Sequence, residues 1–570
     1  MYFDFLVKIP DKRGKITYRT KAEVNYIYYE YDRIYDKTTK ITNPKRATIG
    51  KKSAEDPSMM YPNQNFLKYF PDAELPVEKD RTNRSSCLKI GAWIVIRKII
   101  REYGLDVTLA GLLNKKDLGL FLDLAAYSIV TEDNAGQYYP NYAYIHPLFT
   151  DNMRIYSDSR ISDMLRSLTD DQSVGFLNEW NASRNHREKI YISYDSTNKN
   201  CQAGDIEMVE YGHPKQGCGL PVFNYAIAYD TYNKEPLFYE KYPGSITDVS
   251  QLQFMLDRVA DYGYKKIGFI LDRGYFSKAN IRSMDSHGYP FVIMVRGMAS
   301  FVNGLILNHK GEFENKWKNH IDDYDVYGTT LTSKLYEDDG NDRYFHIYHS
   351  ILKEGSERTN LAARIKQMKT FLMKHVNQTM EFGSIFHKYF ILHYNEQNGV
   401  FLFPEEKTDV IERENALSGY FCIITSDKMT AKQAIGLYKS RDNSEKLFRG
   451  DKSYLGNKSL RVHSDVSAAA KIFVEFVALI IRSRIYTSLM EEIRTMGKKP
   501  NYMTVPAAIG ELEKIEVVRH TDNIYRLDHA VTAHQKTILN AFGIDVAYVK
   551  HMAVQIGKEL EQAVNFVGRE

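Results

Sequence analysis

The stretch of sequence that decides the fold is Lys189-Ile-Tyr-Ile-Ser-Tyr-Asp195, together with Ile267-Gly-Phe-Ile-Leu-Asp-Arg-Gly274 further along the chain. Each is a short apolar run that ends in an aspartate, a pattern typical of a buried strand with a polar residue at its carboxyl end. Open α/β sheets place their ligands at the carboxyl ends of strands. Asp195 and Asp272 are therefore candidate site residues, although Asp272 taken singly could simply cap a turn.

The elements around these two strands predict an α/β core. Further strands are predicted at 220–231, 235–242 and 291–295, and helices at 249–262 and after the N-cap candidate Ser277. The order β-β-β-α-β-α-β is the layout of an RNase H-like core, and it is also compatible with other α/β folds.

The whole chain divides into six predicted regions. In chain order they are a basic β-rich N-terminal region (1–78), a helical region expected to bind DNA (79–187), the first part of the core (188–297), a β-rich insertion (298–418), the second part of the core (419–495) and a C-terminal mixed and helical tail (496–570). The insertion is predicted to hold strands at 343–349 and 388–394. The tail could pack between the protomers of a dimer or on its own core.

A third candidate acid follows the insertion. Thr430 and Gln433 form a capping box that opens a long predicted helix. Further along it, Tyr438, Arg441, Glu445 and Lys452 are spaced so that all four fall within roughly 60° of one helical face. One carboxylate beside two cations and a phenol suits a helix that faces both a metal ion and a phosphate backbone.

Taken together, these motifs resemble the DDE cut-and-paste transposases of bacterial insertion sequences. The resemblance rests on Asp195-Ser-Thr, Asp272-Arg-Gly-Tyr and the spacing of Tyr438, Arg441, Glu445 and Lys452, and it is to the group with the Y-(2)-R-(3)-E-(6)-K signature, insertion sequence family four and its close relatives. This group has an RNase H-like core with a β-rich insertion between its second Asp and its Glu. Here 173 residues separate Asp272 from Glu445, which leaves room for such an insertion.

The resemblance implies a role for each motif residue. Asp195, Asp272 and Glu445 would be the catalytic carboxylates and would hold two Mg²⁺ ions, for which Mn²⁺ could substitute; oxygen ligands suit these ions. Tyr438, Arg441 and Lys452 would contact the transposon end. Arg273 would be an additional phosphate contact. Trp317 could stack on a displaced base, or it could be an ordinary core or surface tryptophan.

The function that the resemblance implies is cut-and-paste DNA transposition. The protein would bind the terminal inverted repeats of its element, cleave the ends by two-metal phosphodiester hydrolysis and join the 3′-OH ends to target DNA. It would act as a homodimer in a synaptic complex, in the bacterial cytoplasm at the nucleoid. Two alternatives remain open: an RNase H-like structure-specific nuclease, and a domesticated, inactive DNA-binding protein.

The charge distribution agrees with a DNA partner. The chain of 570 residues has a formal net charge of only +4. However, residues 1–52 hold 13 Lys and Arg against six Asp and Glu, with tyrosines interleaved, and residues 432–461 hold eight against three. We therefore expect two basic surfaces, with a net negative charge on the rest of the chain. The distribution of charge, and not the total net charge, indicates a nucleic-acid binder.

Composition also excludes several classes of protein. Four cysteines cannot form a disulfide framework, and ordinary free thiols are favoured over a metal cluster of Cys201, His213 and Cys218. The N-terminus lacks the layout of a signal peptide. The most apolar stretch, 468–481, is broken by Lys471 and Glu475 and is too short to span a bilayer, so it is predicted to be a buried helix.

Overall fold

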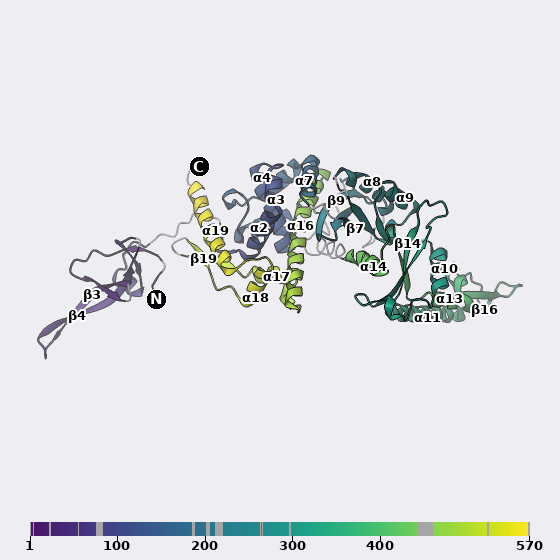
Figure 1. Ribbon diagram of the computed structural model, residues 1–570. Helices are drawn as coiled ribbons and strands as arrows, with labels where there is room; N and C mark the ends of the chain where they lie inside the picture. The colour runs from purple at the N-terminus through teal and green to yellow at the C-terminus, as the bar shows by residue number, and fades with distance from the viewer. Residues whose placement is uncertain are drawn as a thin grey trace. The chain divides into compact units, whose positions relative to one another are not determined.

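The computed structural model forms two compact units, which are described separately (Figure 1). One unit comprises residues 1–173, 453–457 and 466–570, and the other comprises residues 174–452 and 458–465. The structure describes residues 2–3, 5–21, 24–54, 56–75, 84–184, 189–200, 206–210, 221–262, 264, 266–295, 298–442, 455, 460–520 and 524–567.

A nine-stranded mixed sheet forms the centre of the second unit. Its order is β12-β13-β14-β17-β11-β10-β7-β8-β9. The bounds are β7 Ile190–Asn200, β8 Val222–Asp230, β9 Glu235–Pro243, β10 Ile267–Leu271, β11 Phe291–Met294, β12 His320–Ile321, β13 Val326–Ser333, β14 Arg343–His349 and β17 Tyr420–Thr425. The five strands predicted between 189 and 295 are confirmed. Strands β7, β8 and β9 are antiparallel, whereas β7, β10 and β11 run parallel.

One predicted boundary is wrong. Strand β7 does not end at Asp195 but continues to Asn200, because residues 192–200 pair with β8. The polar run Ser196-Thr-Asn-Lys-Asn200 hides this half of the strand from a pattern that looks for apolar residues. Asp195 instead lies where the pairing with β10 stops.

Helices cover both sides of this sheet. Figure 1 shows α8 (Asp248–Asp261) and α9 (Lys278–Ser286) on one side and α14 (Ala431–Ser440) on the other. The predicted caps are confirmed: the Ser277 side chain accepts a hydrogen bond from the backbone N–H of Asn280, and Thr430 and Gln433 form a capping box. Helix α14 buries Ile435 and Tyr438 in a cluster with Ile270 of β10.

The predicted β-rich insertion is not a separate β domain. Its first strands, β12 to β14, extend the central sheet, because β14 pairs with β13 on one side and with β17 on the other. Strand β14 is also buried along most of its length. The remainder is mostly helical, and a 24-residue helix is its longest element. The remaining elements are α10 Ala299–His309, α11 Ile351–Lys374, α12 Ser384–Tyr389, β15 Phe390–Tyr394, β16 Phe401–Glu406 and α13 Thr408–Ala416. Residues from 361 to 401 form a small core of their own.

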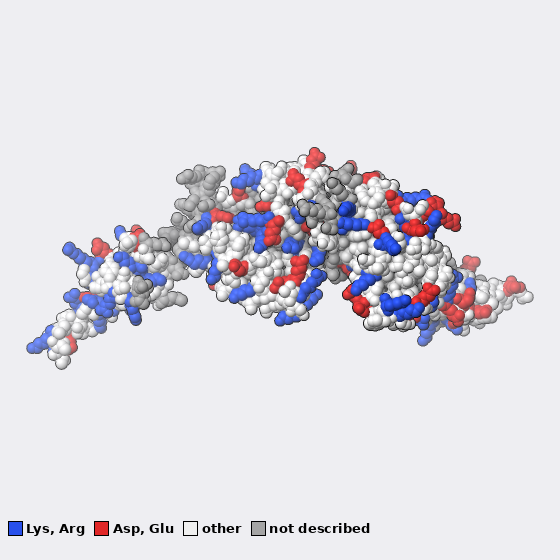
Figure 2. Space-filling model, viewed as in Figure 1, with Lys and Arg blue, Asp and Glu red and all other residues white. Residues whose placement is uncertain are grey.

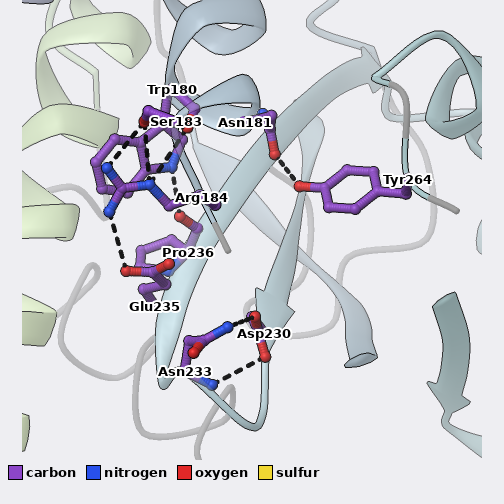
Figure 3. Close-up of polar contacts among 9 residues, drawn as sticks. All are labelled: Trp180, Asn181, Ser183, Arg184, Asp230, Asn233, Glu235, Pro236 and Tyr264. Carbon is purple, nitrogen blue, oxygen red and sulfur yellow. Dashed lines mark hydrogen bonds and ion pairs between the residues drawn. The ribbon is translucent and has the colours of Figure 1, made fainter. Parts of the chain in front are cut away.

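The edge strand β9 is covered by the end of helix α7 (Asp170–Ala182) (Figure 3). The register of β9 skips Leu237, and the carbonyls of Pro236 and Leu237 accept hydrogen bonds from Trp180 Nε1, at 2.9 Å, and Asn181 Nδ2, at 3.0 Å. The Arg184 guanidinium lies 3.8 Å from the Trp180 ring centroid. Unpaired groups on an edge strand are a liability, and these side chains satisfy two of them.

We expect Asn181→Leu to lower the stability of this unit by about 1–3 kcal/mol, because the substitution leaves the buried Leu237 carbonyl without a donor. Denaturant unfolding followed by tryptophan fluorescence would measure the shift, since Trp180 lies beside the substituted residue. Asn178→Leu is the matched control because Asn178 is exposed on the same helix. Equal effects of the two substitutions would contradict the assignment.

A buried histidine lies on β14, the third strand from one edge of the sheet. His346 of β14 is fully buried, and its ring nitrogens lie 2.9 Å from the Thr330 hydroxyl of β13 and 3.0 Å from the Thr425 hydroxyl of β17. Burial lowers the pKa of His346 from 6.5 to about 4. The folded protein therefore keeps this imidazole neutral at pH values where the unfolded chain protonates it.

This lowered pKa predicts acid destabilisation. Between pH 6.5 and about 4 the unfolded chain binds a proton that the folded chain does not, so the free energy of unfolding should fall by about 1.4 kcal/mol per pH unit as the pH decreases. Urea unfolding between pH 7 and pH 5 should show a smaller pH dependence for His346→Gln than for the wild type. His387→Gln, an exposed histidine in the same unit, should leave the slope unchanged.

In the first unit, a helical body combines residues from both halves of the chain. The helical region predicted before residue 187 is observed as α2 Gly91–Tyr103, α3 Leu105–Ala110, α4 Lys115–Thr131, α5 Tyr139–Ile145 and α6 Asp158–Ser167. Helix α16 (Asp465–Met496) packs there too, with Phe473 against Phe121. The sequence pattern predicts that residues 466–495 belong to the core, but the structure places them in this helical body. Helix α16 is buried on all sides between residues 472 and 483, so it lacks the single apolar face that would indicate its packing partner.

The C-terminal segment packs on its own chain, but on this helical body rather than on the core. Its elements are α17 Val505–Leu512, β18 Glu516–Arg519, β19 Tyr525–Leu527, α18 Ala533–Asn540 and α19 Val546–Val567. Strand β18 pairs with both β19 and β6 (Cys87–Lys89). Leu512, Ile515, Val517, Ile538 and Leu539 are buried. The tail therefore buries these apolar side chains within its own chain.

The N-terminal region is a five-stranded antiparallel sheet with the order β1-β5-β4-β3-β2. The bounds are β1 Val7–Lys8, β2 Ile16–Lys21, β3 Val24–Asp36, β4 Ile41–Lys52 and β5 Met59–Pro62, and helix α1 spans Gln64–Tyr69. Its core holds Phe5, Val7, Ile27, Ile49, Met60 and Phe66. The far halves of β3 and β4 form a long, exposed hairpin.

In the part of the chain that the structure describes, no helix combines the length and apolar character needed to cross a membrane.

Candidate active site

The register of the central sheet brings two of the predicted carboxylates together. Strands β7 and β10 pair in parallel, and the last pair in the ladder is Tyr194 with Leu271. Asp195 is the next residue of β7, and Asp272 directly follows the last residue of β10, so the ladder leaves both acids at the same end of this strand pair. The parallel ladder thus aligns two acids that are 77 residues apart in sequence.

Alternation along the strands decides which side of the sheet these carboxylates occupy. Tyr194 is fully buried, and its hydroxyl donates to Glu240 at 2.7 Å; Gln251 of α8 donates to the same carboxylate. Burial, followed by the nearby Glu240 charge, raises the pKa of Tyr194 well above its ordinary value, so Tyr194 remains a donor. Asp195 alternates with Tyr194 and therefore lies on the opposite side, the side of α14.

A cation from the end of α14 reaches this pair. Arg441 is the C-cap of the helix, and its Nη1 lies 2.9 Å from Asp272 Oδ1. The guanidinium stands 5.3 Å from the centroid of the Tyr438 ring, which is itself buried against the sheet. Tyr438 and Arg441 thus come together as their spacing predicted, and the Tyr438 ring packs against the Arg441 guanidinium.

Helix α14 ends at Ser440, whereas the sequence pattern predicts one long helix. Glu445 and Lys452 lie outside the described residues.

Asp272 also caps a short turn, which confirms one of its two sequence interpretations. Its Oδ1 accepts a hydrogen bond of 2.8 Å from the backbone N–H of Arg273, at the start of the 3₁₀-helix Arg273–Tyr275. The Arg273 side chain is exposed. In the same turn, Tyr275 is fully buried, and its ring centroid lies 5.7 Å from that of Tyr194.

Three further side chains support the site, although the sequence pattern assigns none of them a role. Tyr194, Glu240 and Tyr275 are connected by a hydrogen bond and a ring contact next to Asp195 and Asp272. Of the three, Tyr275 could have been found from the sequence, because it directly follows Asp272-Arg-Gly. Burial, then the charges of Asp248, Tyr242 and Asp195, raises the pKa of Tyr275 well above its ordinary value. Tyr275 therefore stays neutral beneath the two acids.

Trp317 is an exposed surface residue. It begins the 3₁₀-helix Trp317–Asn319 that precedes β12, and 77% of its surface is accessible. Its ring stacks on His320 with 4.9 Å between centroids and 15° between planes. One face of the ring is therefore in contact with His320, and most of the side chain remains accessible.

The acids at the sheet edge suit a hard divalent cation. Asp195 lies where the β7–β10 pairing stops and Asp272 directly follows β10, and both offer carboxylate oxygens, the ligand type that Mg²⁺ prefers. Among the described residues, no group of three or more His, Cys, Asp or Glu side chains could hold a metal ion. Cys201, His213 and Cys218 lie outside the described residues, as does Glu445.

Sequence comparison identifies the family. The sequence model of the transposase DDE domain matches residues 188–481, and the chain belongs to this family. A search of curated proteins finds no match. Among solved structures, the chain is similar to a piggyBac transposase synaptic complex with hairpin DNA, studied by cryo-EM. The identity is 9% and the TM-score is 0.31, over 88% of this chain and 80% of that one.

Proposed function

We propose that this protein is a cut-and-paste DNA transposase with an RNase H-like core. The observation that carries the proposal is the alignment of Asp195 with Asp272 on parallel strands, with Arg441 beside them. The match of the transposase DDE domain to residues 188–481 supports the same reaction class. The enzyme cleaves the ends of its element and joins the 3′-OH ends to target DNA.

Asp195, Asp272 and Glu445 are the proposed metal ligands. These residues would hold two Mg²⁺ ions, or Mn²⁺ in their place, which would supply Lewis acidity for activating the attacking water or 3′-OH and for stabilising the leaving oxygen. The chain itself positions the two described carboxylates through the β7–β10 ladder and the buried tyrosines beneath it. Arg441 offsets the negative charge of Asp272, which limits repulsion between the acids.

The DNA backbone is proposed to lie along the same sheet edge. Arg441 has a planar, multiply donating guanidinium and can bind a phosphate oxygen while it remains over Tyr438. Arg273 is exposed beside Asp272 and provides a second phosphate contact. Lys452 is a third, from the family signature. Trp317 has an accessible ring face that can stack on a displaced base.

Two wider features complete the proposal. The cognate DNA consists of the element's terminal inverted repeats, bound through the N-terminal 186 residues. Two copies act as a homodimer in a synaptic complex. A structure-specific nuclease and an inactive DNA-binding protein are the alternatives. They differ in measurable ways, because only a transposase both requires the repeats and transfers strands.

Asp272→Ala should abolish Mg²⁺-dependent strand cleavage while binding to the repeats persists. The substrate would be labelled duplexes carrying the repeats that flank the gene, and cleavage and binding would be followed by gel electrophoresis. Asp427→Ala is the matched control, because Asp427 follows β17 at the opposite edge of the same sheet, where it pairs with Lys189. This control should cleave normally.

Three results would overturn the proposal. Undiminished cleavage by Asp272→Ala would show that the metal site is elsewhere. Equal cleavage of duplexes without the repeats would favour a general nuclease. Binding without any metal-dependent cleavage by the wild type would favour an inactive DNA-binding protein.

Arg441→Ala should reduce cleavage about 10-fold to 100-fold and lower the salt dependence of repeat binding by about one phosphate contact, since one cation is lost from the interface. Compared with Arg441→Ala, Arg441→Lys should restore the salt dependence of repeat binding more fully than it restores the cleavage rate. Lysine keeps the positive charge but lacks the planar guanidinium. Binding titrations over a range of salt concentrations, beside single-turnover cleavage, would separate the two effects. A normal cleavage rate in Arg441→Ala would contradict this role.

A further inference from the structure

The N-terminal sheet has two faces of different character. One face is covered by α1 and carries the apolar core, where the Tyr29 ring lies against Tyr69 and Phe70. The other face presents tyrosines and cations. We call it the tyrosine face and define it by six residues: Tyr2, Arg19, Tyr26, Tyr28, Lys51 and Tyr61.

Strand register places these residues in a continuous patch. Arg19 pairs with Tyr26, Tyr26 with Lys51, and Lys51 with Tyr61, so the four side chains form one row across β2, β3, β4 and β5. Residues that pair directly across strands point to the same face. Tyr28 lies two residues from Tyr26 on the same face, about 7 Å further along β3.

The rings of the tyrosine face are in contact with cations. Arg19 lies 5.4 Å from the centroid of the Tyr28 ring. Lys51 Nζ lies 5.0 Å from the Tyr61 centroid and 5.9 Å from the Tyr2 centroid, and the Tyr2 and Tyr26 centroids are 6.1 Å apart. Each distance falls within the range of a cation–π or aromatic pair.

These tyrosines are not part of the hydrophobic core. Tyr2, Tyr26, Tyr28 and Tyr61 are all partly exposed, and Arg19 is exposed. The described core cluster of this sheet contains none of the four rings. In Figure 2, Lys and Arg gather over the N-terminal sheet and its hairpin, and far fewer acids appear in that view. The patch is therefore an aromatic surface in positively charged surroundings.

We propose that the tyrosine face binds single-stranded DNA by base stacking. Open sheet faces with neighbouring aromatic side chains hold unpaired bases in known single-strand binders, and flanking cations hold the phosphates. A duplex keeps its base faces stacked internally, so it cannot use the rings in this way. The charge balance of residues 1–52, 13 basic against six acidic, complements a polyanion.

Tyr26→Ala and Tyr28→Ala in the full chain should each weaken binding of a single strand about 5-fold to 150-fold, the usual effect of removing one stacking ring. The probe is a fluorescein-labelled oligothymidylate of about 20 nucleotides, longer than one single-strand site. Binding is followed by fluorescence anisotropy in EDTA. Because no metal or cleavage is involved, this test and the test of the proposed transposase activity can fail independently.

Matched variants separate stacking from other effects. Tyr26→Phe and Tyr28→Phe keep the ring and should bind within about twofold of the wild type. Tyr18→Ala removes an exposed tyrosine on the opposite face and should have no effect. Arg19→Gln is exposed, so the fold tolerates it, and it should lower the salt dependence of single-strand binding by about 0.7 in the log–log slope.

Several outcomes would overturn the proposal. Wild-type affinity in both alanine variants would exclude the tyrosine face from binding. Equal losses for a single strand and for a duplex of the same length would show that the surface contacts only the backbone. If the alanine variants lost their melting transition, the Tyr→Phe and Arg19→Gln variants would provide the test instead. Weaker single-strand binding by the Tyr→Phe variants, or an unchanged salt dependence of binding in Arg19→Gln, would refute stacking beside Arg19.

Discussion

The parallel pairing of β7 with β10 is the constraint on which the rest of the site depends. Its last pair, Tyr194 with Leu271, determines that Asp195 and Asp272 follow at the same level. A shift of one residue would turn one of the two carboxylates to the opposite face of the sheet. The buried hydroxyl of Tyr194 is bonded to Glu240 of β9 across the intervening strand β8, and this bond helps to hold the register.

The site also requires that the helix following the long insertion packs next to Asp195 and Asp272. Helix α14 does so because strands of the insertion widen the sheet and β17 carries the chain back between β14 and β11. Ile435 and Tyr438 then anchor the helix on Ile270, the residue that shares a sheet face with Asp272. Arg441 arrives beside Asp272 as a result of this packing.

The sequence predicts the centre of this fold well and its periphery less well. Short apolar strands such as 267–271 and capped helices such as those after Ser277 and Thr430 carry strong local signals, and the structure confirms them. Which elements pack or pair with one another cannot be predicted from the local sequence alone. The polar second half of β7 is recognisable only from its pairing with β8. Helix α16 is buried on all sides along its middle, so no single apolar face indicates the unit to which it belongs. The Asp272–Arg441 contact likewise depends on packing across the sheet.

The docking of α7 on β9 also has a consequence for assembly. An uncovered edge strand can recruit a strand from another chain, by β-augmentation or in an aggregate. At the outer edge of β9, the carbonyls of Pro236 and Leu237 are already bonded to Trp180 and Asn181. A second copy of the chain would have to break both bonds to extend the sheet there, so oligomers must form through side-chain surfaces instead of a shared sheet at this stretch.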